Sequence, residues 1–318
     1  MSALRARAEE YLVMRRALGF RLTTQGRHLM SFVRFCEERG ADRVTTDLAI
    51  GWATRTSRGS DDEVYQARRL DVVRIFARHL RALDPATEVP PEDVLSRRYR
   101  RIPRYLYSPR EIAALMTAAD DLAPALRAAT WRTLIGLLAV TGMRQGEACR
   151  VSRGDVDLET GTLVIADSKF GKSRQVFLHS TAAAALRAYA RGRDRLFLKP
   201  KADTFFVNSR GGQLDGHNIQ HTFAVLVAAA GIQASPGQRA PRLHDLRHTF
   251  TVATMLDWYR NGQNVQARLP LLSTWLGHVD PKSTYWYLQE GSEIASDGRE
   301  TAGQLASGVS EWRLPPVA

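Results

Sequence analysis

Apolar residues in the first ninety or so positions recur three and four apart, which is the spacing of one face of an α-helix. In the clearest run, Leu29, Phe32 and Cys36 follow a pair of threonines that could cap the helix, and Gly40 can end it. Similar runs precede and follow this one, and strand-like alternation is scarce. The pattern predicts a small helical domain over residues 1–93.

A basic stretch without helical spacing comes next. Pro85, Pro90 and Pro91 break regular structure, and six arginines with no acidic residue lie from Arg97 to Arg110. Arginines interleaved with tyrosines suit contact with DNA phosphates and with sugars or bases, although a solvated basic connector has the same composition. The sequence predicts an Arg-rich linker over residues 94–107. The expected DNA-contacting arginines are Arg97, Arg98, Arg100, Arg101 and Arg104, and the interleaved tyrosines are Tyr99, Tyr105 and Tyr107.

A second domain is predicted over residues 108–290. Ser108, Pro109 and Glu111 have the form of a capping box with proline at the first helical position. A long apolar helix should follow, ending near Gly142, and then an alternating segment that predicts a short antiparallel sheet. Further helices are expected near Ser180, Asn218 and Leu243.

The remaining segments carry weaker patterns. Residues 261–270 are expected to form a loop, and residues 291–318, which are weakly apolar and rich in Gly and Ser, a C-terminal tail. The whole pattern therefore predicts a mainly α protein with a small antiparallel β-sheet, built from two domains and the linker between them.

Composition points to an anionic partner. The chain of 318 residues has a formal net charge of +12 and a pI of about 10.2, and forty of its 45 basic residues are arginines. Phosphate polyanions are the commonest surfaces that attract such a balance. A site that needs a proton donor would keep lysine, because arginine does not release its proton near neutral pH.

Other sequence features limit the class of protein. No apolar run is long enough to span a membrane, and the first residues carry charges where a signal peptide needs an apolar core. We therefore expect a cytoplasmic protein associated with the nucleoid and no membrane partner. Cys36 and Cys149 lie far apart without metal-ligand spacing, which predicts reduced thiols in the core.

Two charged motifs could carry chemistry. In TGMRQGE, Arg144 follows directly after the helix stop at Gly142, and Glu147 lies one turn further on. This places a guanidinium at the boundary of an element, with a carboxylate that could orient it. A surface Arg–Glu pair is the alternative interpretation, and it is favoured when the motif is taken alone.

In HDLRH, His244 and Arg247 stand three apart and therefore share one helix face. His248 is also one turn from His244, so a zinc site is an alternative. A metalloprotease helix has glutamate after its first histidine, where Asp245 stands here, and no further ligand cluster accompanies it. The sequence therefore predicts no metal site.

Lysine and tyrosine candidates lie nearer the ends of predicted elements. Lys169 is at the end of a strand, beside a turn that includes Lys172, and a hairpin tip of this kind could deliver an ammonium as general acid. An ordinary basic hairpin is equally compatible with the stretch. In PKSTYWYLQ, Tyr285 and Tyr287 lie about 200° apart around a helix axis, so only one of them could face a given site.

Four motifs in this order resemble the tyrosine recombinases, the phage-integrase and Xer-type enzymes. They are Arg144-x-x-Glu147, Lys169 on a hairpin, His244-x-x-Arg247, and LGH with a tyrosine nine residues after its histidine. The family spacing selects Tyr287 and leaves Tyr285 as a packing residue. The resemblance runs from about Ser108 to Tyr287, and it implies that the N-terminal helical region is a core-binding domain.

The resemblance also implies a role for each site residue. Tyr287 would be the nucleophile that forms a 3′-phosphotyrosine, and Lys169 would protonate the leaving 5′-oxygen. Arg144 and Arg247 would hold the non-bridging phosphate oxygens, and His278 would donate to them. His244 would accept a proton or hydrogen bond, and Glu147 would order the site. The chemistry implied requires neither cofactor nor metal, and the GKS at residues 171–173 lacks the glycine spacing of a nucleotide-binding loop.

The partners that the resemblance implies are double-stranded DNA and further recombinase subunits. The subunits would form a DNA-bound homo-oligomer, from dimer to tetramer, or a hetero-oligomer with related recombinases. The reaction would be site-specific recombination, serving the integration, excision or transposition of a mobile element. Two alternatives are a type IB topoisomerase-like enzyme, which shares the nucleophilic chemistry, and a sequence-specific DNA-binding protein that does not cleave.

Overall fold

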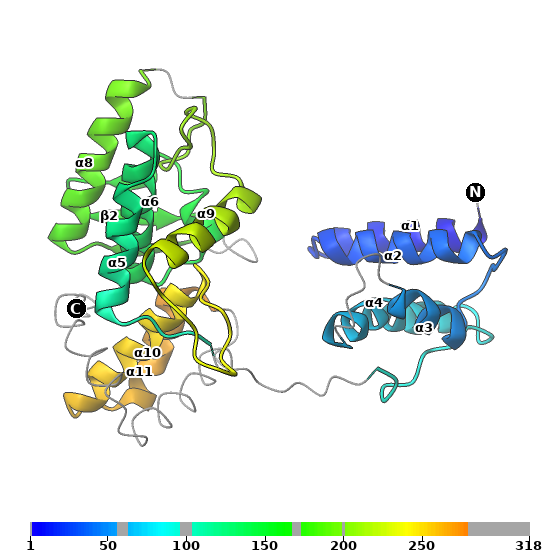
Figure 1. Cartoon of the computed structure of the whole chain (residues 1–318). Coiled ribbons are helices and arrows are strands. Elements are labelled where there is room, and N and C mark those ends of the chain that lie inside the picture. Colours follow the sequence, from blue (N-terminus) through cyan, green and yellow to red (C-terminus); the bar gives the residue numbers. More distant parts are fainter. Residues whose placement is uncertain (1, 56–62, 96–103, 167–172, 199–200, 279–318) are drawn as a thin grey trace. The chain divides into compact units, whose positions relative to one another are not determined.

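The protein consists of two compact units, Met1–Arg101 and Ile102–Ala318 (Figure 1). The computed structural model describes residues 2–55, 63–95, 104–166, 173–198 and 201–278. Residues 96–103 of the predicted linker and the whole predicted tail lie outside this part, so the exact domain boundaries stay predictions. Among the described helices, none is both long and apolar enough to cross a bilayer.

The N-terminal unit is a helical bundle of α1 (Ala3–Ala17), α2 (Thr23–Glu37), α3 (Thr46–Thr54) and α4 (Glu63–Arg81). Helix α2 contacts the other three, and its apolar face supplies much of the core, which includes the predicted buried thiol of Cys36. The threonine cap predicted for α2 is wrong. The cap position is Leu22, whose φ is +45°, and no side chain caps the helix.

One buried arginine fixes the chain as it leaves this bundle. Arg74 of α4 donates to the carbonyl oxygens of Pro90 (2.9 Å), Pro91 (2.7 Å) and Val94 (3.2 Å). Its side chain is only 8% exposed, and Asp71 compensates its charge at 2.6 Å. Proline-containing segments leave carbonyl groups without helical partners, and here a guanidinium satisfies them.

The C-terminal unit begins with α5 (Pro109–Asp120), which lies alongside α6 (Ala125–Thr141) (Figure 1). The predicted capping box is confirmed, because Ser108 and Glu111 make both of its reciprocal hydrogen bonds. Helix α6 ends at Gly142, whose φ of +61° is left-handed backbone that favours glycine.

A three-stranded antiparallel sheet follows, in the order β1 (Val156–Asp157), β2 (Thr162–Ile165), β3 (Arg174–Phe177). Leu163 pairs with Val176, and both are buried on the inner face of the sheet. The predicted class, a mainly α protein with a small antiparallel sheet, is confirmed.

The remaining helices are α7 (Gln145–Ala148), α8 (Ser180–Leu196), α9 (Gly216–Ala229), α10 (Asp245–Arg260) and α11 (Val265–Leu276). The loop predicted over 261–270 is wrong from Val265 onward, where α11 begins. Asn264 caps this helix by accepting from the Ala267 amide at 3.1 Å, and its apolar face is buried. That buried face supports the helix although Pro270 lies within it and lacks an N–H.

Two tyrosines expected to touch DNA are instead core residues of this unit. Tyr105 is 6% exposed and Tyr107 is fully buried, and the centroids of their rings lie 4.9 Å apart. The Tyr107 hydroxyl donates to the carbonyl of Arg242 at 3.1 Å. Their predicted contact with DNA is therefore wrong, because their apolar rings pack against the helices of the C-terminal unit. Tyr99 lies outside the described residues.

Candidate active site

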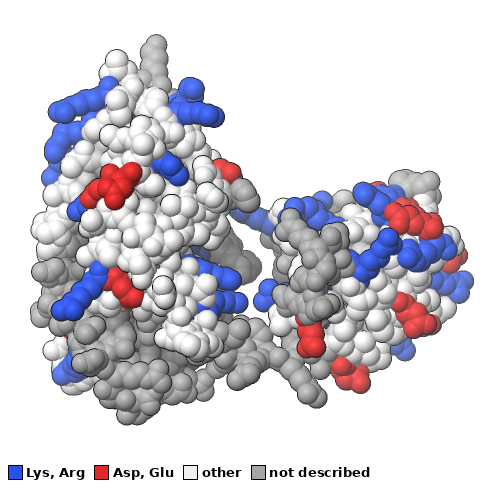
Figure 2. All heavy atoms as spheres, viewed as in Figure 1, with Lys and Arg blue, Asp and Glu red and all other residues white. Residues whose placement is uncertain are grey.

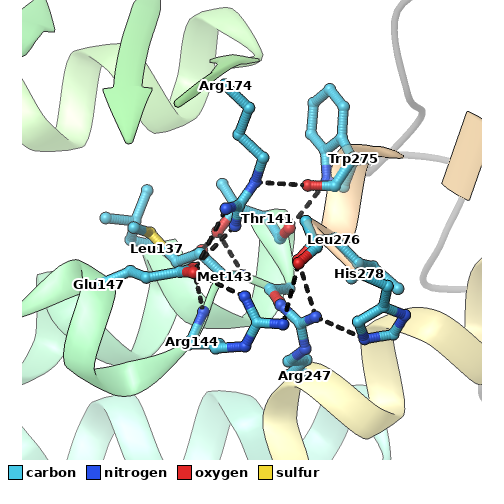
Figure 3. Close-up of polar contacts among 12 residues, drawn as sticks. Leu137, Thr141, Met143, Arg144, Glu147, Arg174, Arg247, Trp275, Leu276 and His278 are labelled. Carbon is cyan, nitrogen blue, oxygen red and sulfur yellow. Dashed lines mark hydrogen bonds and ion pairs between the residues drawn. The ribbon is translucent and has the colours of Figure 1, made fainter. Parts of the chain in front are cut away.

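Arg144 lies where α6 has ended and α7 is about to begin. The left-handed turn at Gly142 redirects the chain, so that Arg144 occupies the N-cap of α7 with extended backbone. Its guanidinium donates to Glu147 Oε1 (2.8 Å) and to the carbonyl oxygen of Gly277 (3.0 Å) (Figure 3). The side chain is 28% exposed, so Arg144 is both held by the protein and accessible.

Glu147 is the carboxylate that holds both Arg144 and a second arginine, Arg174. It is 4% exposed and accepts four hydrogen bonds, two from Arg144 and two from Arg174. Burial alone would raise its pKa, but the hydrogen bonds and charge of Arg174, together with the hydrogen bonds of Arg144, outweigh burial and lower it to about 2. The pair of Arg144 and Glu147 is therefore not the surface pair that the motif alone favours.

Arg247 approaches the same place from the first turn of α10. It is buried, and it donates to the carbonyl oxygens of Gly142 and Leu276, each at 2.8 Å. It also lies 2.8 Å from His278 Nε2. Because a guanidinium has no acceptor atom, we assign Nε2 as the unprotonated nitrogen of this ring, which leaves Nδ1 as its donor.

The end of α11 joins these groups. Gly277 ends the helix with a φ of +65°, and the Trp275 indole donates to the carbonyl of Thr141 at 2.8 Å. The carbonyls of Leu276 and Gly277 are consecutive in the chain, and they accept from Arg247 and Arg144 respectively. The ends of α6 and α11 thus bring together two guanidiniums that stand 103 positions apart in the sequence.

Both histidines of the site are held neutral near pH 7. Burial, followed by the positive charges of Arg247 and then other arginines, lowers the pKa of His244 to about 4. Burial and the charges of Arg247, Arg144 and Arg174 likewise lower the pKa of His278 to about 4. A neutral imidazole can accept a proton, as the role expected of His244 requires.

The structure brings together Arg144, Glu147, Arg247 and His278, and it places His244 at the N-cap of α10. Arg104 is described and half-buried, and its charge contributes to lowering the pKa of His244. The remaining predicted site residues lie outside the part of the chain that the structure describes. They are Lys169, Tyr287, Arg97, Arg98, Arg100 and Arg101. Lys172 and Tyr285, the neighbouring candidates of Lys169 and Tyr287, lie outside it as well.

Sequence reasoning missed Arg174, the first residue of β3. It shares the inner face of that strand with Val176, two positions further on. Its side chain is 9% exposed and forms an ion pair with Glu147 at 2.7 Å. The available signal was the alternation of the strand, which places a charged residue at an inward position.

Comparison with known proteins identifies the family. Residues 106–293 match the phage integrase family. The chain is 39% identical over 303 residues to the integrase/recombinase y4rB of Sinorhizobium fredii (strain NBRC 101917 / NGR234), covering 93% of this chain and 96% of the relative. It is 32% identical over 234 residues to the tyrosine recombinase XerC of Bacillus subtilis (strain 168), covering 72% and 71% of the two chains.

Solved structures agree at the level of the fold. A lambda integrase tetramer bound to a Holliday junction superposes with a TM-score of 0.59 at 17% identity, covering 87% of this chain and 78% of that one. The family match and the relatives confirm the family predicted from four short motifs, and with it the expectation of an enzyme that cleaves and rejoins DNA. The chain belongs to the phage integrase family of tyrosine recombinases.

Proposed function

We propose that the protein recombines DNA at specific sites through a 3′-phosphotyrosine intermediate on Tyr287, in the service of a mobile element. The observation that carries the proposal is the convergence of Arg144 and Arg247 on consecutive carbonyls at the end of α11, with His278 directly after them. Two fixed guanidiniums suit the negative charge that builds on a phosphate as it is attacked.

In the proposed reaction, the Tyr287 oxygen attacks the scissile phosphorus and the bond from phosphorus to the 5′-oxygen breaks. The tyrosine proton passes to neutral His244, and the Lys169 ammonium gives a proton to the leaving 5′-oxygen. Arg144 and Arg247 hold the non-bridging oxygens, and His278 donates to one of them. Attack by a 5′-hydroxyl on the phosphotyrosine then rejoins a strand, with the proton transfers reversed.

This chemistry has consequences for what the enzyme needs. The phosphotyrosine conserves the energy of the phosphodiester bond, so rejoining requires no nucleotide. The guanidiniums supply positive charge at the phosphate, and we accordingly expect activity without added metal.

The proposed partner is double-stranded DNA bound by several subunits. Basic side chains are spread over the faces of both units in view, among fewer acidic ones (Figure 2). Related structures include a lambda integrase tetramer on a Holliday junction, which supports a DNA-bound homo-oligomer, from dimer to tetramer. The alternative DNA-bound assembly is a hetero-oligomer with related recombinases.

The test is a denaturing gel of protein incubated without metal or ATP with a nicked duplex carrying the end sequence of its element. Wild type and Tyr285→Phe should form a covalent adduct, and Tyr287→Phe should bind DNA without forming one. An adduct in Tyr287→Phe would reject the nucleophile. Binding without any adduct would favour a DNA-binding protein that does not cleave, and cleavage of unrelated sequences would favour the topoisomerase-like alternative.

A further inference from the structure

Arg174 occupies a position that normally holds an apolar side chain. It opens β3, pairs with Ile165 at the end of β2, and shares the buried face of Val176. The strands β2 and β3 are joined by residues 166–173, which include Lys169. A charge on a buried face is costly unless it is paired, so its partners indicate what it does.

Those partners belong to two other elements of the site. Nη2 and Nη1 of Arg174 donate to the two oxygens of Glu147 at 2.7 and 3.3 Å. Nε donates to the carbonyl of Trp275 in the last turn of α11 at 2.8 Å. Figure 3 shows the guanidinium between the carboxylate and that carbonyl. One side chain of the sheet therefore contacts both α7 and α11.

We propose that Arg174 is a positioning residue for the cleavage reaction, acting through Glu147 and the end of α11 to fix Arg144 against the scissile phosphate. The inference rests on the function proposed above. Arg144 has two side-chain hydrogen bonds, to Glu147 and to the Gly277 carbonyl, and Arg174 supports the acceptor of each. Without Arg174, Glu147 would lose two of its four hydrogen bonds, and the turn at Gly277 would lose the guanidinium that bonds to the Trp275 carbonyl.

The packing at Gly277 supports this arrangement. A Cβ on Gly277 would lie 2.5 Å from Nη1 of Arg174, so the guanidinium packs directly against the turn whose carbonyl receives Arg144. The φ of Gly277 is +65°, which favours glycine as well. The glycine of the LGH motif thus provides the space that Arg174 occupies.

Lysine could not reproduce these contacts. The planar guanidinium donates in one direction to a carboxylate and in another to a carbonyl, whereas an ammonium is a compact charge at the end of a flexible stem. Arg174→Lys keeps the charge and loses the geometry, and Arg174→Gln loses both. The two variants therefore separate the effect of charge from the effect of position.

The experiment compares two nicked duplexes that differ only at the scissile phosphate, one a normal phosphodiester and the other an uncharged methylphosphonate. The rate of adduct formation is measured in a single turnover with saturating protein, and DNA binding is measured in parallel. The uncharged methylphosphonate depends less on a correctly placed guanidinium. A variant that misplaces Arg144 should therefore show a smaller loss of cleavage rate on it than on the phosphodiester. Arg144→Ala is the reference, and Arg191→Gln, an exposed arginine of α8, controls for lost charge.

We expect Arg174→Gln and Arg174→Lys to bind DNA and to cleave the phosphodiester roughly tenfold to a hundredfold slower than wild type, as a small misplacement of a catalytic group can cost. Their defects should shrink on the methylphosphonate, as that of Arg144→Ala should. Equal defects on both substrates, or wild-type rates on both, would overturn the role of Arg174. If the glutamine variant does not fold, the lysine variant decides by the same comparison.

Failure of the proposed function gives a different result. If wild type forms no adduct on the phosphodiester, or if Arg144→Ala is equally defective on both substrates, the phosphate-binding role of Arg144 is wrong and the inference about Arg174 fails with it. A reference that behaves as expected, beside Arg174 variants that do not, rejects the inference about Arg174 alone.

Discussion

Arg247 donates from Nη1 to the carbonyl oxygen of Gly142 over 2.8 Å, although 105 residues separate them. The bond joins the first turn of α10 to the end of α6, where Gly142 has a left-handed backbone conformation. Phe250, one turn after Arg247, packs against the same glycine. Helix α10, which carries Arg247, therefore contacts and supports the backbone turn that precedes Arg144.

Replacing Gly142 should cost more than its backbone conformation alone explains. A Cβ there would lie 2.3 Å from the Phe250 ring, whereas Gly262, with a similar φ of +64°, has open space around it. We expect Gly262→Ala to lower the free energy of unfolding by about 1–2 kcal/mol. Gly142→Ala should lower it by roughly 1–3 kcal/mol more through overpacking. Urea unfolding measures both, and equal losses would contradict the contact with Phe250.

Acid should destabilise the C-terminal unit in two steps. The pKa of His278 is lowered from 6.5 to about 4 in the folded state, so the unfolded state binds more protons between these values. Its stabilising contribution is complete above about pH 6.5 and is lost as the pH falls towards 4. The pKa of Glu147 is lowered from 4.5 to about 2, so its contribution is lost below about pH 4.5.

Urea unfolding as a function of pH tests both steps. His278→Asn should reduce the loss of stability between pH 6.5 and 4 without abolishing it, because the pKa of His244 is also lowered to about 4. Glu147→Gln should change the pH dependence below about 4.5. The glutamine should also destabilise the protein at pH 7, by about 3–5 kcal/mol, because it leaves the nearly buried Arg174 and the partly exposed Arg144 without their counter-charge. A wild-type stability that is constant from pH 6.5 to 4 would contradict the histidine contribution.

Arg74 should hold the segment that leaves the N-terminal bundle. Arg74→Met removes donors to three carbonyls, so amide exchange in residues 92–95, which follow the two prolines, should become faster. Arg78→Met is the matched control. Its ion pair with Glu92 joins side chains that are 52% and 82% exposed, and such pairs contribute about 0–1 kcal/mol. Similar exchange rates in both variants would argue against a specific role for Arg74.

Lys169→Ala should be slow on a normal phosphodiester, because the leaving 5′-oxygen would lack its proton donor. A bridging sulfur at the same position leaves without protonation, so the variant should cleave that substrate at close to the wild-type rate. Single-turnover adduct formation on the two substrates is the measurement. Equal defects on both would reject Lys169 as general acid, and Lys172→Ala serves as the control within the same hairpin.

The linker arginines should contribute to DNA affinity through phosphates. Replacing Arg97, Arg98, Arg100 and Arg101 by glutamine should weaken binding and reduce the slope of log affinity against log salt by up to about 0.9 for each lost phosphate contact. Fluorescence anisotropy across a salt series measures that slope. An unchanged slope would assign these arginines to a solvated connector.

The sequence by itself determined the class of fold, the capping box at Ser108 and the end of α6 at Gly142. These depend on local spacing and on residues with restricted or special backbone preferences, which act over a few positions. It also determined the family, because four short motifs in a fixed order are specific together although each is weak alone.

Only the tertiary structure decided which side chains share the site and which belong to the core. The burial of Tyr105 and Tyr107, the helix around Pro270 and the position of Arg174 depend on contacts between segments far apart in the chain. Neither periodicity nor motif spacing reports such contacts. Arg174 is the clearest case, because its role depends on Glu147, 27 residues before it, and on Trp275, 101 residues after it.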